Sequence, residues 1–226
     1  MPDQPADTRR IMLMVLACLI PGLMLEAVLI DGNGVLLNVL TATLVAVLTD
    51  RCCTWMRAPR QAAGSSLAMR ATASDASALV TALILAAALP PGAVAPVALA
   101  TATALALGKH AYGGLGNNVF NPAMMGYAVA LVSMPLATAS WPAVASNDAD
   151  ALTGATVLTV FRYRGAATVE DVWTEAAGFG QMAGAGYEWV ALAFGLGGAV
   201  LIARGLAAWR PAAGMLIALS IAALLG

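Results

Sequence analysis

The sequence predicts an all-α integral membrane protein with about six to seven transmembrane helices, several of them short or broken. Hydrophobic residues make up 61% of the 226 residues, charged residues only 10%, and the mean hydropathy is +0.83. A soluble domain is typically about 25% charged, so this chain lacks the polar surface that water requires. The apolar residues also occur in runs separated by turn residues, as expected of successive membrane helices.

Two long apolar runs open the chain. Residues 11–30 have about the length that a bilayer needs, and residues 35–49 form a second predicted span. Pro21-Gly22 predicts a kink in the first run, and Asp31-Gly32-Asn33-Gly34 predicts a tight turn after it. Glu26 lies near the far end of the first run. An acid there either marks an ion path or lies at the outer interface beside Asp31.

The next segments are shorter and interrupted. Residues 51–73 are rich in arginine and predict a solvated loop, and Asp75 is in a plausible position to cap the following helix. Residues 76–89 and 93–107 are too short for full straight spans, and Leu89-Pro90-Pro91-Gly92 separates them. Short helices broken by Pro and Gly are typical of discontinuous membrane helices around a site near the midplane.

The rest of the chain divides into three parts. A fifth span is predicted at about 120–138, which closes an N-terminal membrane repeat of five helices, residues 1–138. Residues 139–186 form a polar segment between two apolar regions. Residues 187–226 contain a sixth span at 187–204 and the beginning of a seventh at 212–226, so we expect them to be the start of a second, incomplete repeat.

The positive charges predict the orientation, because Lys and Arg concentrate in cytoplasmic loops. With the N-terminus inside, two of the eleven Lys and Arg residues fall outside, namely Arg162 and Arg164. The other nine fall inside: Arg9, Arg10, Arg51, Arg57, Arg60, Arg70, Lys109, Arg204 and Arg210. The segment 139–186 is then on the outer side of a bacterial inner membrane, in the periplasm.

Composition also limits the partners. The net charge is −1 and there is no basic cluster, which argues against a nucleic-acid partner, whereas membrane lipid is an obligatory one. The three cysteines, Cys18, Cys52 and Cys53, form no ligand pattern with the single histidine, so we predict no metal site held by this chain alone.

The outer segment contains the pattern Asp150-Ala151-Leu152-Thr153-Gly154-Ala155-Thr156. A nucleophilic hydroxyl that must enter another enzyme's pocket needs small, flexible neighbours, and Gly154 and Ala155 precede Thr156 here. The pattern resembles the acceptor signature of periplasmic flavin transferases, which move FMN from FAD onto the last hydroxyl. That resemblance implies a covalent FMN on Thr156, with Asp150 and Thr153 belonging to the recognition motif. The alternative is an ordinary polar loop.

A second stretch is more specific. Residues 109–127 read Lys-His-Ala-Tyr-Gly-Gly-Leu-Gly-Asn-Asn-Val-Phe-Asn-Pro-Ala-Met-Met-Gly-Tyr. They resemble a signature of the D subunit of Rnf electron-transport complexes and of the related B subunit of sodium-pumping NADH:quinone reductase. The segments from Asp75 to Pro91 and around Leu19-Ile20-Pro21-Gly22 are similar to the same family, and this chain resembles a short form of it.

The resemblance implies a fold and a function. The fold is the first inverted repeat, and the start of the second, of an arrangement similar to that of urea channels. The function is electron relay through the FMN of Thr156, within a complex that couples electron flow between ferredoxin and NAD to movement of sodium ions or protons. The implied partners are the A, B, C, E and G subunits, and a flavin transferase during maturation. Some relatives also bind riboflavin.

The glycine- and asparagine-rich part of that stretch has two interpretations. Asn117, Asn118 and Asn121 either satisfy the backbone of a broken helix or contact a flavin ring or an ion. We expect Lys109 to anchor the inner face and His110 to be interfacial. A channel or transporter for a small polar solute, without a redox role, is the alternative function that broken helices would also suit; it has no need of the pattern that ends at Thr156.

Overall fold

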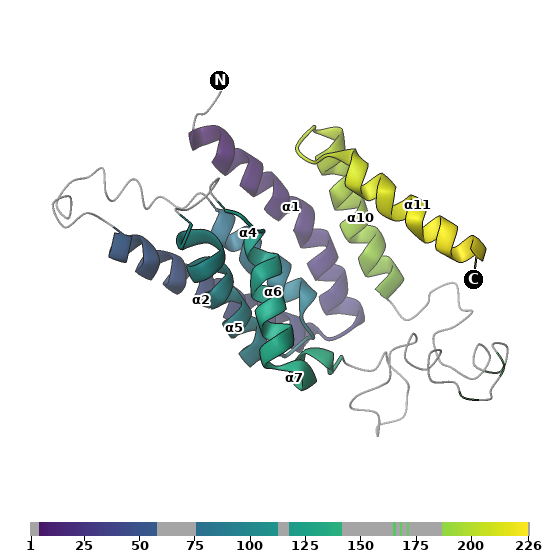
Figure 1. Ribbon diagram of the computed structural model, residues 1–226, viewed down its shortest axis with the longest axis horizontal. Helices are drawn as coiled ribbons and strands as arrows, with labels where there is room; N and C mark the ends of the chain where they lie inside the picture. Colours follow the sequence, from purple (N-terminus) through teal and green to yellow (C-terminus); the bar gives the residue numbers. More distant parts are fainter. Residues whose placement is uncertain are drawn as a thin grey trace.

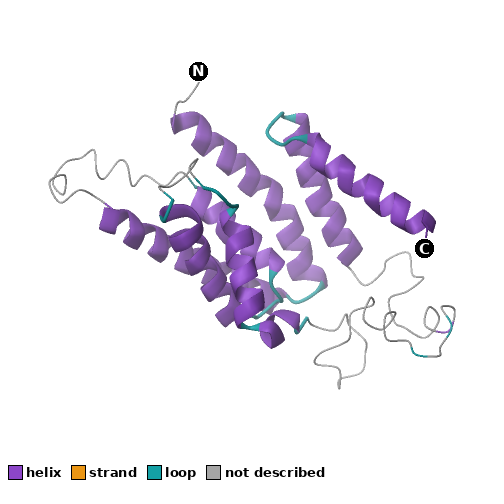
Figure 2. Cartoon of the chain, in the orientation of Figure 1, coloured by secondary structure: helices purple, strands orange, loops and turns teal. Residues whose placement is uncertain are grey.

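The computed structural model describes residues 5–57, 76–112, 118–141 and 187–225, together with Gly165, Thr168 and Asp171. Regular structure within these residues is helical throughout and includes no strand (Figure 2). The predicted all-α class is therefore confirmed for the part of the chain that the structure describes.

The helices follow one another along the chain as α1 (Pro5–Leu29), α2 (Gly32–Arg57), α4 (Ser77–Ala88), α5 (Val94–Thr103), the π-helix η1 (Ala104–His110), α6 (Pro122–Ser133), α7 (Pro135–Ala139), α10 (Tyr187–Ala203) and α11 (Trp209–Leu225). Two of them are long and apolar enough to cross a bilayer, over Thr8–Leu29 and Gly32–Met56. Shorter apolar helices cover Ser77–Ala88, Pro122–Ser133, Trp189–Ala203 and Trp209–Ala222. This composition is consistent with a membrane protein.

The first two helices are longer than the sequence predicted. Helix α1 continues through Pro21 to Leu29, and the turn after it is short because α2 begins at Gly32. The Asp31 side chain caps α2 by accepting a hydrogen bond of 3.1 Å from the Gly34 N–H. Helix α2 then runs past residue 50, where we expected the span to end, and ends at Arg57. The first residues of the predicted loop 51–73 are therefore helical.

Helix α4 begins in an uncommon way. Ala76 occupies the N-cap position with a left-handed φ of 60°, one residue after the predicted cap, and Asp75 itself lies outside the described residues. The predicted break at Leu89-Pro90-Pro91-Gly92 is confirmed, because α4 ends at Ala88 and α5 begins at Val94. Helix α4 has 12 residues, which span about 18 Å and not the roughly 30 Å of a bilayer core.

Asn38 of α2 joins the bundle to this break. Its side chain is fully buried, and its Nδ2 lies 2.9 Å from the Pro90 carbonyl oxygen, 3.3 Å from that of Leu89 and 3.4 Å from that of Ala86. Carbonyl groups at the end of a helix lack intrahelical donors, and Pro90 and Pro91 cannot supply an N–H. Asn38 therefore supplies the donor that the end of α4 lacks.

The predicted fifth span, 120–138, consists of two helices. Asn121 caps α6 by accepting a 3.0 Å hydrogen bond from the Ala123 N–H, and Pro122 occupies the first helical position. Helix α6 ends at Ser133 because Pro135 follows Met134, which has a non-helical backbone with φ −135° and ψ 58°. The short helix α7 continues from Pro135 to Ala139.

Small residues form the core of the bundle. Helix α2 packs against α4 and α5, and α6 packs against α5 and η1 (Figure 1). The buried cluster is dominated by alanine and includes Ala42, Ala46, Ala82, Ala86, Ala100, Ala104 and Ala130. At Gly126 a Cβ would clash with the Ala100 carbonyl oxygen of α5 and lie 2.8 Å from the Ala104 Cβ of η1, so only glycine allows α6 to approach them this closely.

Helix α10 packs along α1, and α11 lies at the edge of the molecule beyond α10 (Figure 1). The contact of α10 with α1 depends on glycine at two levels, since Gly22 lies against the Phe194 ring and Gly197 against the Cys18 carbonyl. These pairs run in opposite directions along the two helices, so α1 and α10 are antiparallel. The apolar side chains of α11 are exposed, including Met215, Leu216 and Leu224.

Candidate functional site

A cluster of paired ionisable side chains, withdrawn from solvent, lies where η1 meets α2. The π-helix covers Ala104–His110 and ends in Lys109 and His110, and the Ala111 N–H continues the wide turn by donating to the Ala106 carbonyl at 3.0 Å. Segments of π-helix are rare and occur frequently at functional sites. Gly108 allows η1 to touch the start of α6, because a Cβ there would lie 2.8 Å from the Cα of Pro122.

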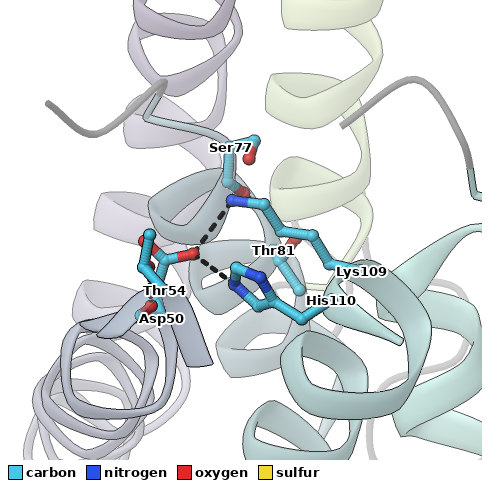
Figure 3. A network of polar contacts seen from close by, with 6 residues as sticks. All are labelled: Asp50, Thr54, Ser77, Thr81, Lys109 and His110. Carbon is cyan, nitrogen blue, oxygen red and sulfur yellow. Dashed lines mark hydrogen bonds and ion pairs between the residues drawn. The ribbon is translucent and has the colours of Figure 1, made fainter. Parts of the chain in front are cut away.

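One carboxylate oxygen of Asp50, in α2, contacts both Lys109 and His110 (Figure 3). This oxygen, Oδ1, lies 3.0 Å from Lys109 Nζ and 2.9 Å from His110 Nε2. In a regular helix consecutive side chains point about 100° apart, so two neighbours rarely reach the same atom. The wider turn of η1 is what allows both residues to converge on Asp50.

These three side chains are almost removed from solvent. The exposed fraction is 16% for the side chain of Asp50, 7% for Lys109 and 9% for His110. Buried charges are tolerated when they are paired and hydrogen-bonded, and here the ammonium and the carboxylate compensate each other. The Thr54 hydroxyl donates to the Asp50 main-chain carbonyl one turn along α2. The contact with Asp50 therefore holds the Lys109 ammonium between α2 and α4. Figure 3 shows Ser77 and Thr81 of α4 at the same place.

A cavity of about 400 Å³ lies beside this network. Its polar lining comes from α4, η1 and the residues before α6, and consists of Ser77, Thr81, Lys109, Asn118 and Asn121. Its apolar lining includes Met12 of α1, Val80, Ile84 and Phe120. An apolar cavity of this size with a few convergent polar groups is a candidate site for a small molecule. The hydroxyls, amides and ammonium suit a planar heterocycle with carbonyl oxygens better than a fully apolar ligand.

Of the predicted asparagines, the structure places two at this cavity. Asn118 and Asn121 both line it, and Asn121 also caps α6, so its structural interpretation is confirmed. Asn117 lies outside the described residues, as do the glycines 113–116. Whether a flavin contacts these amides stays a prediction.

The predicted flavin acceptor lies outside the part of the chain that the structure describes. This holds for Asp150, Thr153, Gly154, Ala155 and Thr156 alike. Within the segment 139–186, beyond the end of α7, a local motif is described at Thr168 and Asp171. The Thr168 hydroxyl and N–H donate to Asp171 Oδ2 at 2.6 and 3.0 Å, and the Asp171 N–H donates back to Thr168 Oγ1 at 3.2 Å. The hydrogen bond from the Thr168 side chain is the main reason why the pKa of Asp171 lies below its usual value.

Sequence reasoning missed the network around Asp50. We expected Asp50 to close the second span, Lys109 to anchor the inner face and His110 to be interfacial. We did not expect a buried Lys109 and two half-buried partners, Asp50 and His110, in contact with one another. One signal was available: an acid at the end of an apolar run and a Lys-His pair at the end of another. Charges in such positions are costly unless they are paired.

The fold and site together define a class of protein. Short, interrupted helices around a buried charged network and a cavity are features of membrane proteins that bind a ligand or an ion within a helical bundle. The profile of the NQR2, RnfD, RnfE family matches residues 3–226, so the chain belongs to that family.

Individual relatives agree with this assignment. The chain is 42% identical to the D subunit of the ion-translocating oxidoreductase complex of Pseudomonas paraeruginosa, over 98% of this chain and 66% of the relative. It is 38% identical to the protein of that name from Alcanivorax borkumensis, over 86% and 60%, and 34% identical to that from Escherichia coli O7:K1, over 97% and 69%. The chain thus spans about two thirds of the length of the curated relatives that it matches.

Proposed function

We propose that this chain acts as the D-type membrane subunit of an ion-translocating oxidoreductase complex and relays electrons through an FMN esterified to Thr156. The observation that carries the proposal is the family match over residues 3–226, within which the acceptor pattern from Asp150 to Thr156 occurs. The complex would be of the Rnf type, exchange electrons between ferredoxin and NAD, and move sodium ions or protons. Its other subunits and a flavin transferase would be the partners.

The proposed topology has the N-terminus in the cytoplasm and segment 139–186 in the periplasm, with six to seven crossings. The arrangement of the helices supports it. Arg57 ends α2, Lys109 lies in the last turn of η1, and Met12 of α1 lines the cavity beside Lys109. Because α10 is antiparallel to α1, its C-terminal end at Ala203, just before Arg204, lies toward the N-terminal end of α1. The basic residues therefore gather at one end of the bundle, as the positive-inside rule expects.

A second part of the proposal concerns the cavity. We propose that Asn118 and Asn121, with Asn117, contact a flavin ring there, which would be a second flavin such as riboflavin. The cavity volume of about 400 Å³ and its mixture of amides, hydroxyls and apolar side chains suit such a ring. A bound flavin would supply one-electron transfer, and the protein would supply position and electrostatics. Lys109, held by Asp50 at 3.0 Å, would present a positive charge to the ring.

The attachment of FMN is tested by in-gel fluorescence under ultraviolet light after denaturation. The protein is produced together with a flavin transferase and with Thr156→Ala or Thr159→Ala. We expect a fluorescent band in the wild type and in Thr159→Ala, and none in Thr156→Ala. Fluorescence that persists in Thr156→Ala would exclude this residue as the sole attachment point. A wild type without fluorescence would favour the alternative function, a channel or transporter for a polar solute.

A further inference from the structure

A second buried carboxyl lies far from Asp50. Glu26 is in α1, three residues before its end at Leu29, and only 3% of it is exposed. Its Oε2 has no hydrogen-bond partner among the residues that the structure describes. Fourteen residues of α1 separate it from Met12 at the cavity, which is about 21 Å along the helix axis. Glu26 is therefore independent of the site built around Asp50.

The helices around Glu26 offer it no positive charge. Helix α1 packs against α10, α2 and α4. The antiparallel register, with Gly22 beside Phe194, continues toward Val190 at the level of Glu26, and Val190 is itself buried. Helix α4 has no titratable residue, and α10 has none from Trp189 to Ala203. The charged residues of α2, which are Asp50, Arg51 and Arg57, belong to its opposite end.

Among the residues that the structure describes, the titratable ones nearest to Glu26 in the sequence and in the helix register are acids. Asp31 lies in the turn after α1, where it accepts a hydrogen bond from Gly34, and Glu188 lies in the first turn of α10. Neither can compensate a negative charge. An isolated carboxylate that is removed from water and lacks a cation is strongly disfavoured, and the simplest cation that relieves it is a proton.

From this geometry we propose that Glu26 is a proton-binding site within the bundle. The carboxylate takes one proton from water to give the neutral acid and returns it when water reaches the group, so an O–H bond forms and breaks and no redox partner is needed. The O–H of the neutral acid can then donate a hydrogen bond, which the carboxylate cannot. The site lies at the end of α1 away from the cavity, and nothing in it depends on a flavin.

The test is chemical labelling of the assembled complex in native membranes. Dicyclohexylcarbodiimide is apolar and reacts with protonated carboxyls, so we expect its mass to be added to the peptide that contains Glu26 at neutral pH. The adduct should decrease as the pH is raised and be absent from Glu26→Gln. Asp50 is the matched control, because it is largely withdrawn from solvent but paired with Lys109, and we expect no adduct there.

A second measurement covers the case in which the reagent does not reach the group. Infrared spectroscopy should show a band of a protonated carboxyl that Glu26→Gln removes. If neither the adduct nor the band is found, the proposal is overturned. It is also overturned if sodium ions at constant pH abolish the labelling, because the carboxyl would then hold sodium.

The fluorescence of FMN attached to Thr156 separates this proposal from the proposed function. Glu26→Gln should retain that fluorescence, which also shows that the variant protein is inserted and matured. A wild-type protein that is fluorescent but shows neither the adduct nor the infrared band would contradict the proton site alone. A wild-type protein that shows the adduct but no fluorescence would contradict the flavin proposal alone.

Discussion

Asp50 and Glu26 are the same kind of group in two different environments. Both are carboxyls in long apolar helices, and both are withdrawn from solvent. Asp50 receives Lys109 at 3.0 Å and His110 at 2.9 Å, whereas Oε2 of Glu26 has no partner among the described residues. Burial alone therefore does not decide what a membrane carboxyl does. Its charge state and its role depend on which groups the fold brings to it.

The difference comes from tertiary structure. The partners of Asp50 are 59 and 60 residues away in the sequence, and they reach it because η1 ends beside α2. Glu26 belongs to α1, which packs against α10 and α4, and the described side chains of those two helices carry no charge. Paired charge fixes one arrangement of helices, and an unpaired acid leaves a group that can change its protonation.

The largest expected effect is the loss of the partner of Asp50. Lys109→Met keeps much of the apolar length of the side chain and removes its charge, which leaves the Asp50 carboxylate with His110 as its one remaining partner among the contacts described above. Breaking a buried ion pair in this way typically costs about 3–5 kcal/mol. We expect a correspondingly large loss of stability, measured by unfolding of the purified protein in detergent.

The control is the double variant Asp50→Asn with Lys109→Met, which removes both charges. It should recover most of the stability lost in Lys109→Met, because replacing both partners of a buried pair is often close to neutral. A double variant as unstable as the single one would mean that packing, and not charge, makes this contact important.

The sequence was sufficient for the all-helical class and for several helix boundaries, because helices in a membrane are determined by local patterns. The apolar runs, the break at Pro90-Pro91 and the cap at Asn121 each depend on neighbouring residues. The ends of helices were predicted less well. Asp50 and Arg51 suggested the end of a span, yet α2 continues to Arg57, and Asp50 contacts Lys109 and His110 within the bundle.

The candidate site was only partly accessible to such reasoning. The pattern around Asn118 and Asn121 pointed to the segment that lines the cavity. The convergence of Lys109 and His110 on one oxygen needs the π-helical turn of η1, and the sequence contains no simple signal for that turn. The acceptor pattern ending at Thr156 is a local motif, recognised from its residues alone, and its position relative to the cavity stays outside what the structure describes.

An intermediate effect is expected at Asn38, a buried polar side chain of α2 whose Nδ2 group donates to the end of α4. Asn38→Leu has a similar volume but removes the donor to the carbonyls of Ala86, Leu89 and Pro90. Unsatisfied buried groups cost about 1–3 kcal/mol, so we expect a loss of stability in that range in the same unfolding measurement. Asn33→Leu, at an exposed position of the same helix, should change stability by less than about 0.5 kcal/mol. Equal effects of the two substitutions would show that Asn38 does not support the end of α4.

The smallest change in stability is expected for Glu26→Gln. Comparing it with the same substitution at the other carboxyl, Asp50→Asn, tests directly whether the two carboxyls differ. Glu26→Gln preserves shape and removes the ability to bind a proton, and no cation among the described residues loses its partner. Stability should therefore change by about 1 kcal/mol or less, the range of substitutions that break no buried charge pair. The analogous change Asp50→Asn, which removes the carboxylate at 3.0 Å from the Lys109 ammonium, should cost several-fold more. If Glu26→Gln were as destabilising as Asp50→Asn, Glu26 would have a cationic partner in the folded protein. The two carboxyls would then be paired in the same way, and the contrast between them would disappear.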